Sequence, residues 1–284
     1  MADPNLAPNS PLVSCLMVTC NRPNLAERAV ACLADQTWPN KELVIVDDGD
    51  VDYEPVLAKY RDRLVIHYHR LERNDATLLG GLRNESLDRA NGEFCMQWDD
   101  DEWYHPERIA VQMQPIVQAG YDCTVLDHTL MHADTEKFLE HPFRTSLAFG
   151  TPGTIVHRSC DVRYPNKRKG EDSTFLRHIK RSQKVKRLDA SHSHLFIRCF
   201  HGANTWDEAH FTERLHYGLR GKLQWAWAVY VRGDLHAHPA FQLTAAEADS
   251  IEQFSAMSDR LKLFATPRSG APSTGVEPAP PASP

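Results

Sequence analysis

Between residues 12 and 126, short apolar segments alternate with segments of helical periodicity, and this alternation constrains the fold more than any other feature. Apolar segments typical of buried strands lie at 12–19, 42–46, 64–68, 94–98 and 122–126. Helices are predicted at 25–33, 54–60 and 81–90, and another from Pro106, because proline is tolerated in the first turn of a helix. Strands that alternate with helices predict a mostly parallel, Rossmann-like central sheet with helices on both faces, an α/β fold.

Beyond residue 127 the alternation gives way to short apolar segments separated by irregular sequence. Strands are predicted at 153–157, 184–188 and 195–200. We therefore expect residues 127–240 to form an α+β region that packs against residues 12–126 as the second half of one domain. A helical segment is expected at 241–265.

The two ends of the chain differ in composition from the rest. Residues 266–284 consist mainly of Pro, Ser, Gly and Ala and contain almost nothing to bury, which is typical of disordered sequence. Residues 1–11 are similarly polar and Pro-rich. We expect a flexible arm over 1–11 and a disordered tail over 266–284.

Charge and cysteine usage narrow the class of protein. The formal net charge is −6, which does not favour duplex nucleic acid as a partner. The densest basic run, 177–187, fits a solvated face, or alternatively a patch for an anionic acceptor or a membrane surface. The seven cysteines include no C-x-x-C pair and fit free thiols. With no signal peptide and no apolar run of about 20 residues, we expect a soluble, cytoplasmic protein.

Polar residues follow three of the predicted strands, at the point where each strand ends. Thr19 closes the first strand, Asp47 and Asp48 follow the second, and residues 99–101 follow the fourth. In open α/β sheets, ligands bind beyond the carboxyl ends of the strands. One cleft could therefore gather all of these side chains.

The run Asp99-Asp100-Asp101-Glu102 places four carboxylates in a row after a buried strand. Crowded like charges are costly unless something positive compensates them. Mg²⁺ or Mn²⁺ would do so, since each is typically held by one or two carboxylates together with phosphate oxygens. Taken alone, the run fits a solvated acidic turn equally well.

The acids after the second strand, Asp47 and Asp48, fit a contact to a nucleotide base or ribose, although Asp-Gly is also a common turn pair. A dinucleotide-binding fold would need G-x-G-x-x-G after the first strand, and residues 19–23 contain no glycine. The P-loop pattern is also absent. NAD(P) and P-loop chemistry are therefore disfavoured.

Two further sites carry candidate catalytic groups. Glu171 and Asp172 fit either acids that complement a helix N-terminus or a general base that takes a proton from an acceptor. His201, after the strand at 195–200, fits either a structural histidine or a ligand of Mn²⁺. Trp225 and Trp227 fit core or rim packing, with stacking on an acceptor as the alternative.

Together these motifs resemble family 2 glycosyltransferases of the GT-A fold. The similarity is carried by residues 13–50, 78–109 and 169–176 and, more loosely, by 196–206. Gln36-Thr37-Trp38-Pro39 and the Asn-Gly-Glu-Phe run at 91–94 are particularly similar to that family. The resemblance implies that 12–126 is the nucleotide-sugar-binding half and 127–240 the acceptor-side, catalytic half. A Q-x-x-R-W motif is absent, which disfavours a processive polysaccharide synthase.

The resemblance also implies donor-binding roles at matching positions. Thr19 and Asp48 would contact the uracil of the donor, with Asp47 and Arg22 beside them. Arg83 falls where the family often places a basic residue near the nucleotide or the diphosphate.

Catalytic and metal-binding roles follow in the same way. Residues 99–101 would form the D-x-D-type motif, in which Asp100 faces the ribose and Asp101 holds Mn²⁺ or Mg²⁺. His201 resembles the second metal ligand of some members. Asp172, with Glu171 beside it, matches the usual catalytic base, and such enzymes invert the anomeric centre by direct displacement.

The leading hypothesis is therefore a metal-dependent, inverting glycosyltransferase that uses a nucleotide diphosphate sugar, most simply a UDP-sugar. Two alternatives remain open on the sequence: a nucleotidyltransferase acting on sugar phosphates, and a non-catalytic carbohydrate-binding protein on a degenerate GT-A fold. The acceptor, whether a saccharide, lipid, peptide or nucleic acid, and the oligomeric state are not specified by the sequence.

Overall fold

A computed structural model of the chain describes residues 10–202, 204, 213–216 and 218–264. Its larger sheet has seven strands in the order β10-β6-β9-β4-β1-β2-β3. Their bounds are β1 (Val13–Thr19), β2 (Lys41–Asp47), β3 (Val65–Arg70), β4 (Phe94–Gln97), β6 (Cys123–Leu126), β9 (Val156–Arg158) and β10 (Val185–Leu188). All of them run in one direction except β9, which is antiparallel to β4 and β6. The expected mostly parallel sheet is confirmed.

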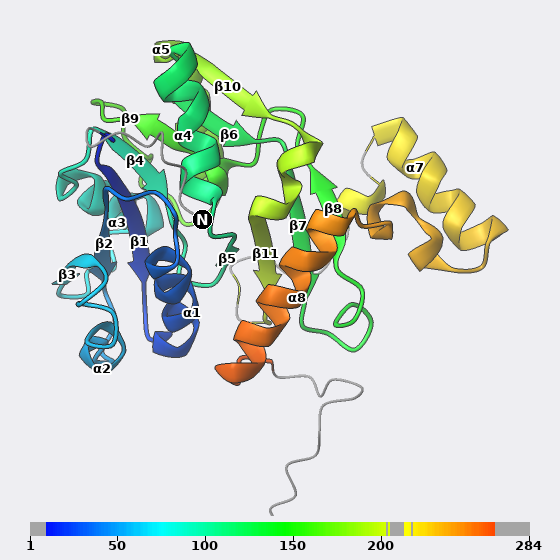
Figure 1. The fold of residues 1–284 in the computed structure, drawn as a ribbon, viewed down its shortest axis with the longest axis horizontal. Helices are drawn as coiled ribbons and strands as arrows, with labels where there is room; N and C mark the ends of the chain where they lie inside the picture. The colour runs from blue at the N-terminus through cyan, green and yellow to red at the C-terminus, as the bar shows by residue number, and fades with distance from the viewer. Residues whose placement is uncertain (1–9, 203, 205–212, 217, 265–284) are drawn as a thin grey trace, which may run out of the picture.

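Helices cover both faces of this sheet (Figure 1). They are α1 (Pro23–Ala34), the short α2 (Glu54–Leu57), α3 (Leu79–Asp88), α4 (Arg108–Ala119) and α5 (Glu171–Ser182). Successive side chains of a strand point to opposite faces. Met17 of β1 therefore lies in the core cluster that contains Ala29 of α1 and Met113 of α4, whereas the neighbouring Leu16 packs with Leu87 of α3.

A second sheet, which the sequence analysis did not predict as a unit, has the strand order β5-β11-β7-β8. Its strands are β5 (Trp103–Tyr104), β7 (His128–Ala133), β8 (Phe143–Ser146) and β11 (Phe196–Phe200). The antiparallel pairing of Ile197 in β11 with Trp103 in β5 brings the end of β11 beside residues 99–102. This sheet therefore connects the acidic run to the second half of the chain.

Several boundaries differ from the sequence expectation, among them those of α8, which spans Ala245–Arg260 where a helical segment was expected at 241–265. The helix expected over 54–60 ends at Leu57, and the one expected from Pro106 begins at Arg108. The strand expected over 153–157 is a 3₁₀ turn followed by β9, because Thr154 and Ile155 donate backbone hydrogen bonds to Thr151 and Pro152 instead of pairing in a sheet.

The rest of the described residues form short turns and two helices. These are the 3₁₀ segments η1 (Pro152–Thr154), η2 (Ala190–Leu195), η3 (Glu213–His216), η5 (Leu235–Ala237) and η6 (Pro239–Phe241), the π-helical turn η4 (Trp227–Val231), α7 (Gly218–Ala226) and α8 (Ala245–Arg260). Among the described residues, no helix is both long enough and apolar enough to cross a membrane. Most of the expected N-terminal arm and all of the expected tail lie outside the described residues, and the division into halves stays a prediction.

Candidate functional site

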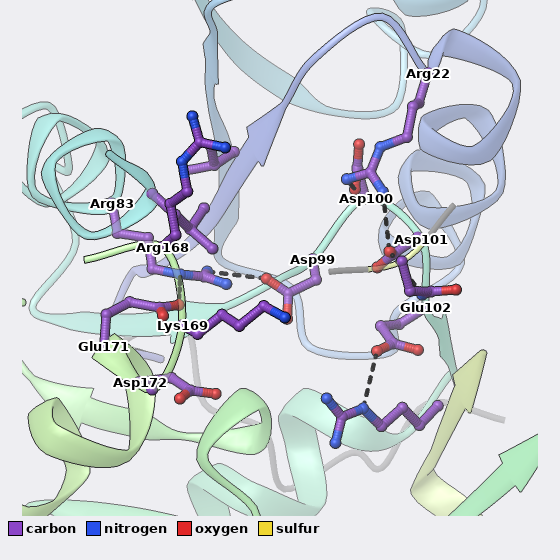
Figure 2. Close-up of a pocket in the computed structure, with 15 residues that line it drawn as sticks. Arg22, Arg83, Asp99, Asp100, Asp101, Glu102, Arg168, Lys169, Glu171 and Asp172 are labelled. Carbon is purple, nitrogen blue, oxygen red and sulfur yellow. Dashed lines mark hydrogen bonds and ion pairs between the residues drawn. The ribbon is translucent and has the colours of Figure 1, made fainter. Parts of the chain in front are cut away.

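The acidic run lies at the carboxyl end of β4, and the end of the neighbouring parallel strand β1 lies beside it. Two hollows that share wall residues open there. Figure 2 shows the residues that line the first of them. The first encloses about 170 Å³ and the second about 480 Å³. Both are lined by Val18, Arg22, Leu79, Arg168 and Lys169. The cleft expected at the strand ends is thus continuous from the end of β1 to the start of α5.

Asp100 is the most enclosed carboxylate of the run, with 1% of its side chain exposed. Thr19 Oγ1 donates to its Oδ2 at 2.5 Å, and Arg22 Nη2 lies 2.6 Å from its Oδ1. The Tyr53 hydroxyl accepts from the Arg22 backbone N–H and lies 2.7 Å from Thr19 Oγ1, so it donates to that oxygen. Burial raises the pKa of Asp100 against the pull of Arg22. Both of its oxygens are therefore engaged within the protein.

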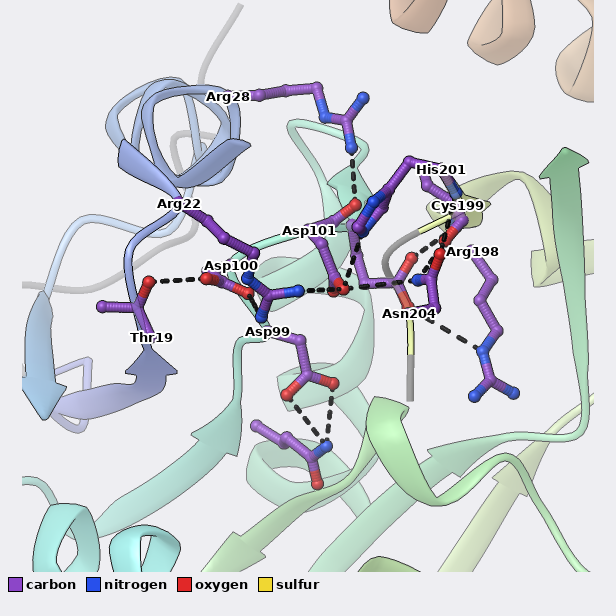
Figure 3. Close-up of polar contacts among 12 residues, drawn as sticks. Thr19, Arg22, Arg28, Asp99, Asp100, Asp101, Arg198, Cys199, His201 and Asn204 are labelled. Carbon is purple, nitrogen blue, oxygen red and sulfur yellow. Dashed lines mark hydrogen bonds and ion pairs between the residues drawn. The ribbon is translucent and has the colours of Figure 1, made fainter. Parts of the chain in front are cut away.

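Asp101 is the point at which three donors converge (Figure 3). Its Oδ2 lies 3.1 Å from Arg22 Nη1, 3.3 Å from His201 Nε2 and 3.4 Å from Asn204 Nδ2. Arg28 Nη2 donates to the Asp101 backbone oxygen at 2.5 Å. Burial would raise the pKa of Asp101, but His201 and Arg22 outweigh it and lower the pKa to about 2. Asp101 is therefore ionised at neutral pH.

On the opposite wall, Arg83 holds two acids together. It lies 2.9 Å from Asp99 through Nη1 and 3.2 Å from Glu171 Oε1 through Nε. Gln97 Nε2 also donates to Asp99 Oδ2, at 2.9 Å. Glu171 is buried, and burial raises its pKa even though Arg83 opposes the effect.

Asp172 lines the first hollow, as Glu171 does, but it is only partly buried, and Figure 2 draws no contact from an arginine to its carboxylate. The Ser173 backbone N–H donates to its Oδ1 at 2.6 Å, in the first turn of α5. Of the two neighbouring acids, Asp172 is the one placed to reach a bound molecule.

The two acids at the end of β2 have different surroundings. Asp47 is fully buried and accepts hydrogen bonds from the Gly49 backbone N–H at 2.8 Å and from the Tyr68 hydroxyl at 2.7 Å. Asp48 lines the second hollow together with Thr19. Asp47 thus shapes the turn behind the cleft, and Asp48 is available to a ligand.

Several residues of the cleft were missed by the sequence analysis. Asn204 and the pair Arg168-Lys169 lie beside recognised motifs, but the sequence pattern gave them no role. Arg73 lines the second hollow from a segment with no motif. Arg28 could have been noticed in the sequence, because it is the charged residue on the face of α1 that is otherwise apolar and buried.

The residues Asp101 and His201 fit a divalent cation, because a carboxylate oxygen and an imidazole nitrogen converge there at 3.3 Å. Among the described residues, no group of three His, Cys, Asp or Glu side chains forms a complete metal cage. Mg²⁺ and Mn²⁺ sites commonly take their other ligands from phosphate oxygens and water. The pair therefore fits a cation that arrives with a diphosphate.

Comparison with known proteins gives a consistent family match. The model of the family described as glycosyl transferase family 2 matches residues 14–198. TuaG of Bacillus subtilis (strain 168), provisionally named as a teichuronic acid biosynthesis glycosyltransferase, is 23% identical over 245 residues, which cover 78% of this chain and 95% of TuaG. In two other relatives, from Bacillus subtilis and Escherichia coli, the match spans only 38% and 37% of the relative's length.

Two solved structures share the fold. S. aureus TarS 1-349 in complex with UDP has a TM-score of 0.55 at 18% identity, covering 90% of this chain and 83% of that one. The mannosyltransferase PcManGT from Pyrobaculum calidifontis, in complex with GDP-Man and Mn²⁺, has a TM-score of 0.51 at 14% identity, covering 89% and 76%. At these identities the likeness concerns the fold alone.

Proposed function

Because this chain belongs to glycosyl transferase family 2, we propose that it transfers a sugar from a nucleoside diphosphate donor, a UDP-sugar, to an acceptor hydroxyl. The observation that carries the proposal is the placement of Asp101 with His201 on one wall of the cleft and Asp172 on another. A group that holds the leaving diphosphate and a group that takes the acceptor proton must flank the anomeric carbon. The first hollow has a candidate for each.

The donor is proposed to lie across both hollows. The larger one, with Thr19 and Asp48 in its wall, suits the nucleoside, and TarS has been solved with both UDP and UDP-GlcNAc. The exposed cations Arg168 and Lys169 line both hollows, where a diphosphate would pass from one to the other. Cations beside a diphosphate stabilise the negative charge that grows as it leaves.

Within the acidic run, the contacts favour roles for Asp99 and Asp100 that differ from those implied by the family resemblance. Asp100 was expected to face the ribose, but Thr19 and Arg22 occupy both of its oxygens. We assign it instead to positioning those two residues. Asp99, whose side chain is 22% exposed, lines the first hollow, although Arg83 and Gln97 already contact its carboxylate. We propose that the ribose contact expected of Asp100 is made by Asp99, because Asp99 is the more exposed of the two.

Asp101 and His201 would hold a divalent cation, as PcManGT holds Mn²⁺ in its complex, and the cation would supply Lewis-acid stabilisation to the leaving diphosphate. Asp172 accepts the proton of the acceptor hydroxyl as the acceptor oxygen bonds to the anomeric carbon. The bond from that carbon to the diphosphate oxygen breaks at the same time, and UDP leaves. Attack from the side opposite the diphosphate inverts the anomeric centre.

Calorimetric titration of UDP tests the donor site. We expect UDP to bind the wild type in the presence of Mn²⁺, to lose that binding in EDTA, and to show no binding to Asp101→Ala. The exposed Asp62→Ala serves as a matched control and should behave as the wild type. If no nucleoside diphosphate binds with any divalent metal, the proposal is wrong.

Asp172→Asn tests the catalytic base separately from donor binding. We expect UDP affinity to stay close to that of the wild type, since the amide keeps the shape of the carboxylate. Release of UDP from a panel of UDP-sugars should fall about hundredfold or more, because the acceptor loses its general base. Unchanged UDP release from the variant would assign the base to another residue.

A further inference from the structure

The outer side of α7 and η4 carries a stripe of exposed apolar side chains. Of the nine most exposed large apolar residues in the described part of the chain, five lie within residues 219–231. Their exposed fractions are Leu219 78%, Leu223 63%, Trp227 46%, Tyr230 75% and Val231 72%. The sequence analysis favoured packing for Trp227, and this exposure does not fit that interpretation.

Spacing along the helix explains why these side chains share one face. Leu219, Leu223 and Trp227 follow each other at intervals of four residues, so they lie above one another on the helix surface. Trp225 and Ala228 point the other way: Trp225 packs on the cluster around β7 and β8, and Ala228 is fully buried. The segment is therefore held to the molecule by one face and presents a second apolar face outward. In Figure 1, α7 projects from the edge of the molecule beyond β8.

The charge of this segment has one sign. Residues 218–232 contain Arg220, Lys222 and Arg232 but no Asp or Glu, although the whole chain carries a net charge of −6. Lys222 and Arg232 are exposed, and the Arg232 guanidinium lies 5.6 Å from the centre of the Trp227 ring. Exposed cations beside an apolar stripe complement an anionic surface.

We infer that α7 and η4 dock this protein on an anionic lipid surface, with the stripe 219–231 entering the boundary between headgroups and acyl chains. An amphipathic helix with Trp and Leu on one face and Lys and Arg beside it binds in the plane of a bilayer. Trp and Tyr are favoured at that depth because each has an apolar ring and a polar group. The surface fits a second copy of the chain less well, since a two-fold contact through this stripe would bring like cations together.

Co-sedimentation with vesicles tests the inference. We expect the full-length wild type to bind phosphatidylcholine vesicles containing roughly one third phosphatidylglycerol, to bind pure phosphatidylcholine more weakly, and to be released by salt. Leu223→Glu should lower the partition into the anionic vesicles about tenfold or more, because it places a negative charge in the apolar stripe. Val117→Glu, at a similarly exposed aliphatic position in α4, is the matched control and should bind as the wild type.

The remaining outcomes decide against the inference. Circular dichroism and a cooperative melting transition show whether Leu223→Glu is folded, so a folded variant that still sediments with anionic vesicles overturns the inference. A wild type that stays in the supernatant overturns it as well. Light scattering that shows a dimer in the wild type and a monomer in Leu223→Glu would assign the stripe to a second copy. Vesicle binding does not depend on the proposed donor chemistry, so either proposal can fail without the other.

Discussion

Arg22 lies where two carboxylates need a counter-ion. Its guanidinium contacts Asp100 at 2.6 Å and Asp101 at 3.1 Å, and its side chain is about one third exposed. Neighbouring carboxylates repel one another unless a positive charge compensates them. We infer that Arg22 supplies this charge when no divalent cation is bound, so that it competes with metal that arrives without a nucleotide.

Substitution of Arg22 should therefore strengthen the binding of metal alone. For Arg22→Ala we expect Mn²⁺ affinity in the absence of nucleotide to rise about tenfold, the size typical of one lost charge at a partly buried site. Electron paramagnetic resonance of unbound Mn²⁺ measures this directly. Arg22→Lys keeps the charge and should stay near the wild type. Weaker Mn²⁺ binding by the alanine variant would contradict the competition.

The N-terminus of α8 is an element whose stability depends on one carboxylate. Thr244 and Glu247 form a capping box, in which each side chain accepts from the other residue's backbone N–H. Glu247 also accepts from Ser193 Oγ at 2.5 Å and from Arg144 Nε at 2.5 Å. Burial would raise the pKa of Glu247, but the hydrogen bonds from Arg144 and Ser193 outweigh it and lower the pKa to about 2. The helix is thus joined to β8 and to η2 through one side chain.

The lowered pKa of Glu247 predicts the pH range in which this contact stabilises the fold. A carboxylate with a lowered folded-state pKa stabilises the protein above its unfolded pKa, near 4.5, and the contribution is lost as pH falls toward 2. Glu247→Gln keeps the capping geometry without the charge. We expect its melting temperature to lie below that of the wild type at pH 7, with a difference that shrinks as pH falls through this range. A difference in melting temperature between the two proteins that is the same at every pH would contradict a role for the Glu247 charge.

At the scale of the molecule, α8 is linked to the acidic run through Arg28. Arg28 is buried between the two: it donates to the Asp101 backbone oxygen, its Nη1 lies 3.2 Å from Ser258 Oγ, and it lies 5.2 Å from the centre of the Phe254 ring. Phe254 is itself fully buried in the main core. Packing of α8 therefore helps to fix the backbone that carries Asp101.

Removal of the Phe254 ring should affect both the fold and the site. We expect Phe254→Ala to lower the free energy of unfolding by about 3–5 kcal/mol, as for other large core truncations. UDP affinity with Mn²⁺ should also fall, because Arg28 loses the ring against which it packs. Denaturant unfolding and calorimetry measure the two effects. Phe254→Leu should retain most of the stability and most of the UDP affinity. If Phe254→Ala is destabilised but binds UDP as the wild type does, the packing of α8 does not affect the site.

The central sheet, its helices and the family follow from the amino-acid sequence alone. Alternating apolar and helical segments are local patterns, and strand ends in a parallel sheet meet at one edge, so these patterns suffice to place Thr19, Asp48 and residues 99–101 together. The GT-A fold class and the resemblance to family 2 are both confirmed. Family membership also gives no support to the nucleotidyltransferase alternative.

The second sheet and the pairing of charges, in contrast, depend on tertiary contacts. The strand β7 contains His128, Thr129 and His132, so it shows no apolar run, although most of it is buried by packing against β8 and β11. The partners of Asp100 come from β1 and from the residue that precedes α1, and those of Asp101 also come from beyond β11. These contacts join residues separated by about 80 to 100 positions. A local sequence pattern does not predict such pairing, because side-chain hydrogen bonds and ion pairs depend on distances that only the folded chain defines.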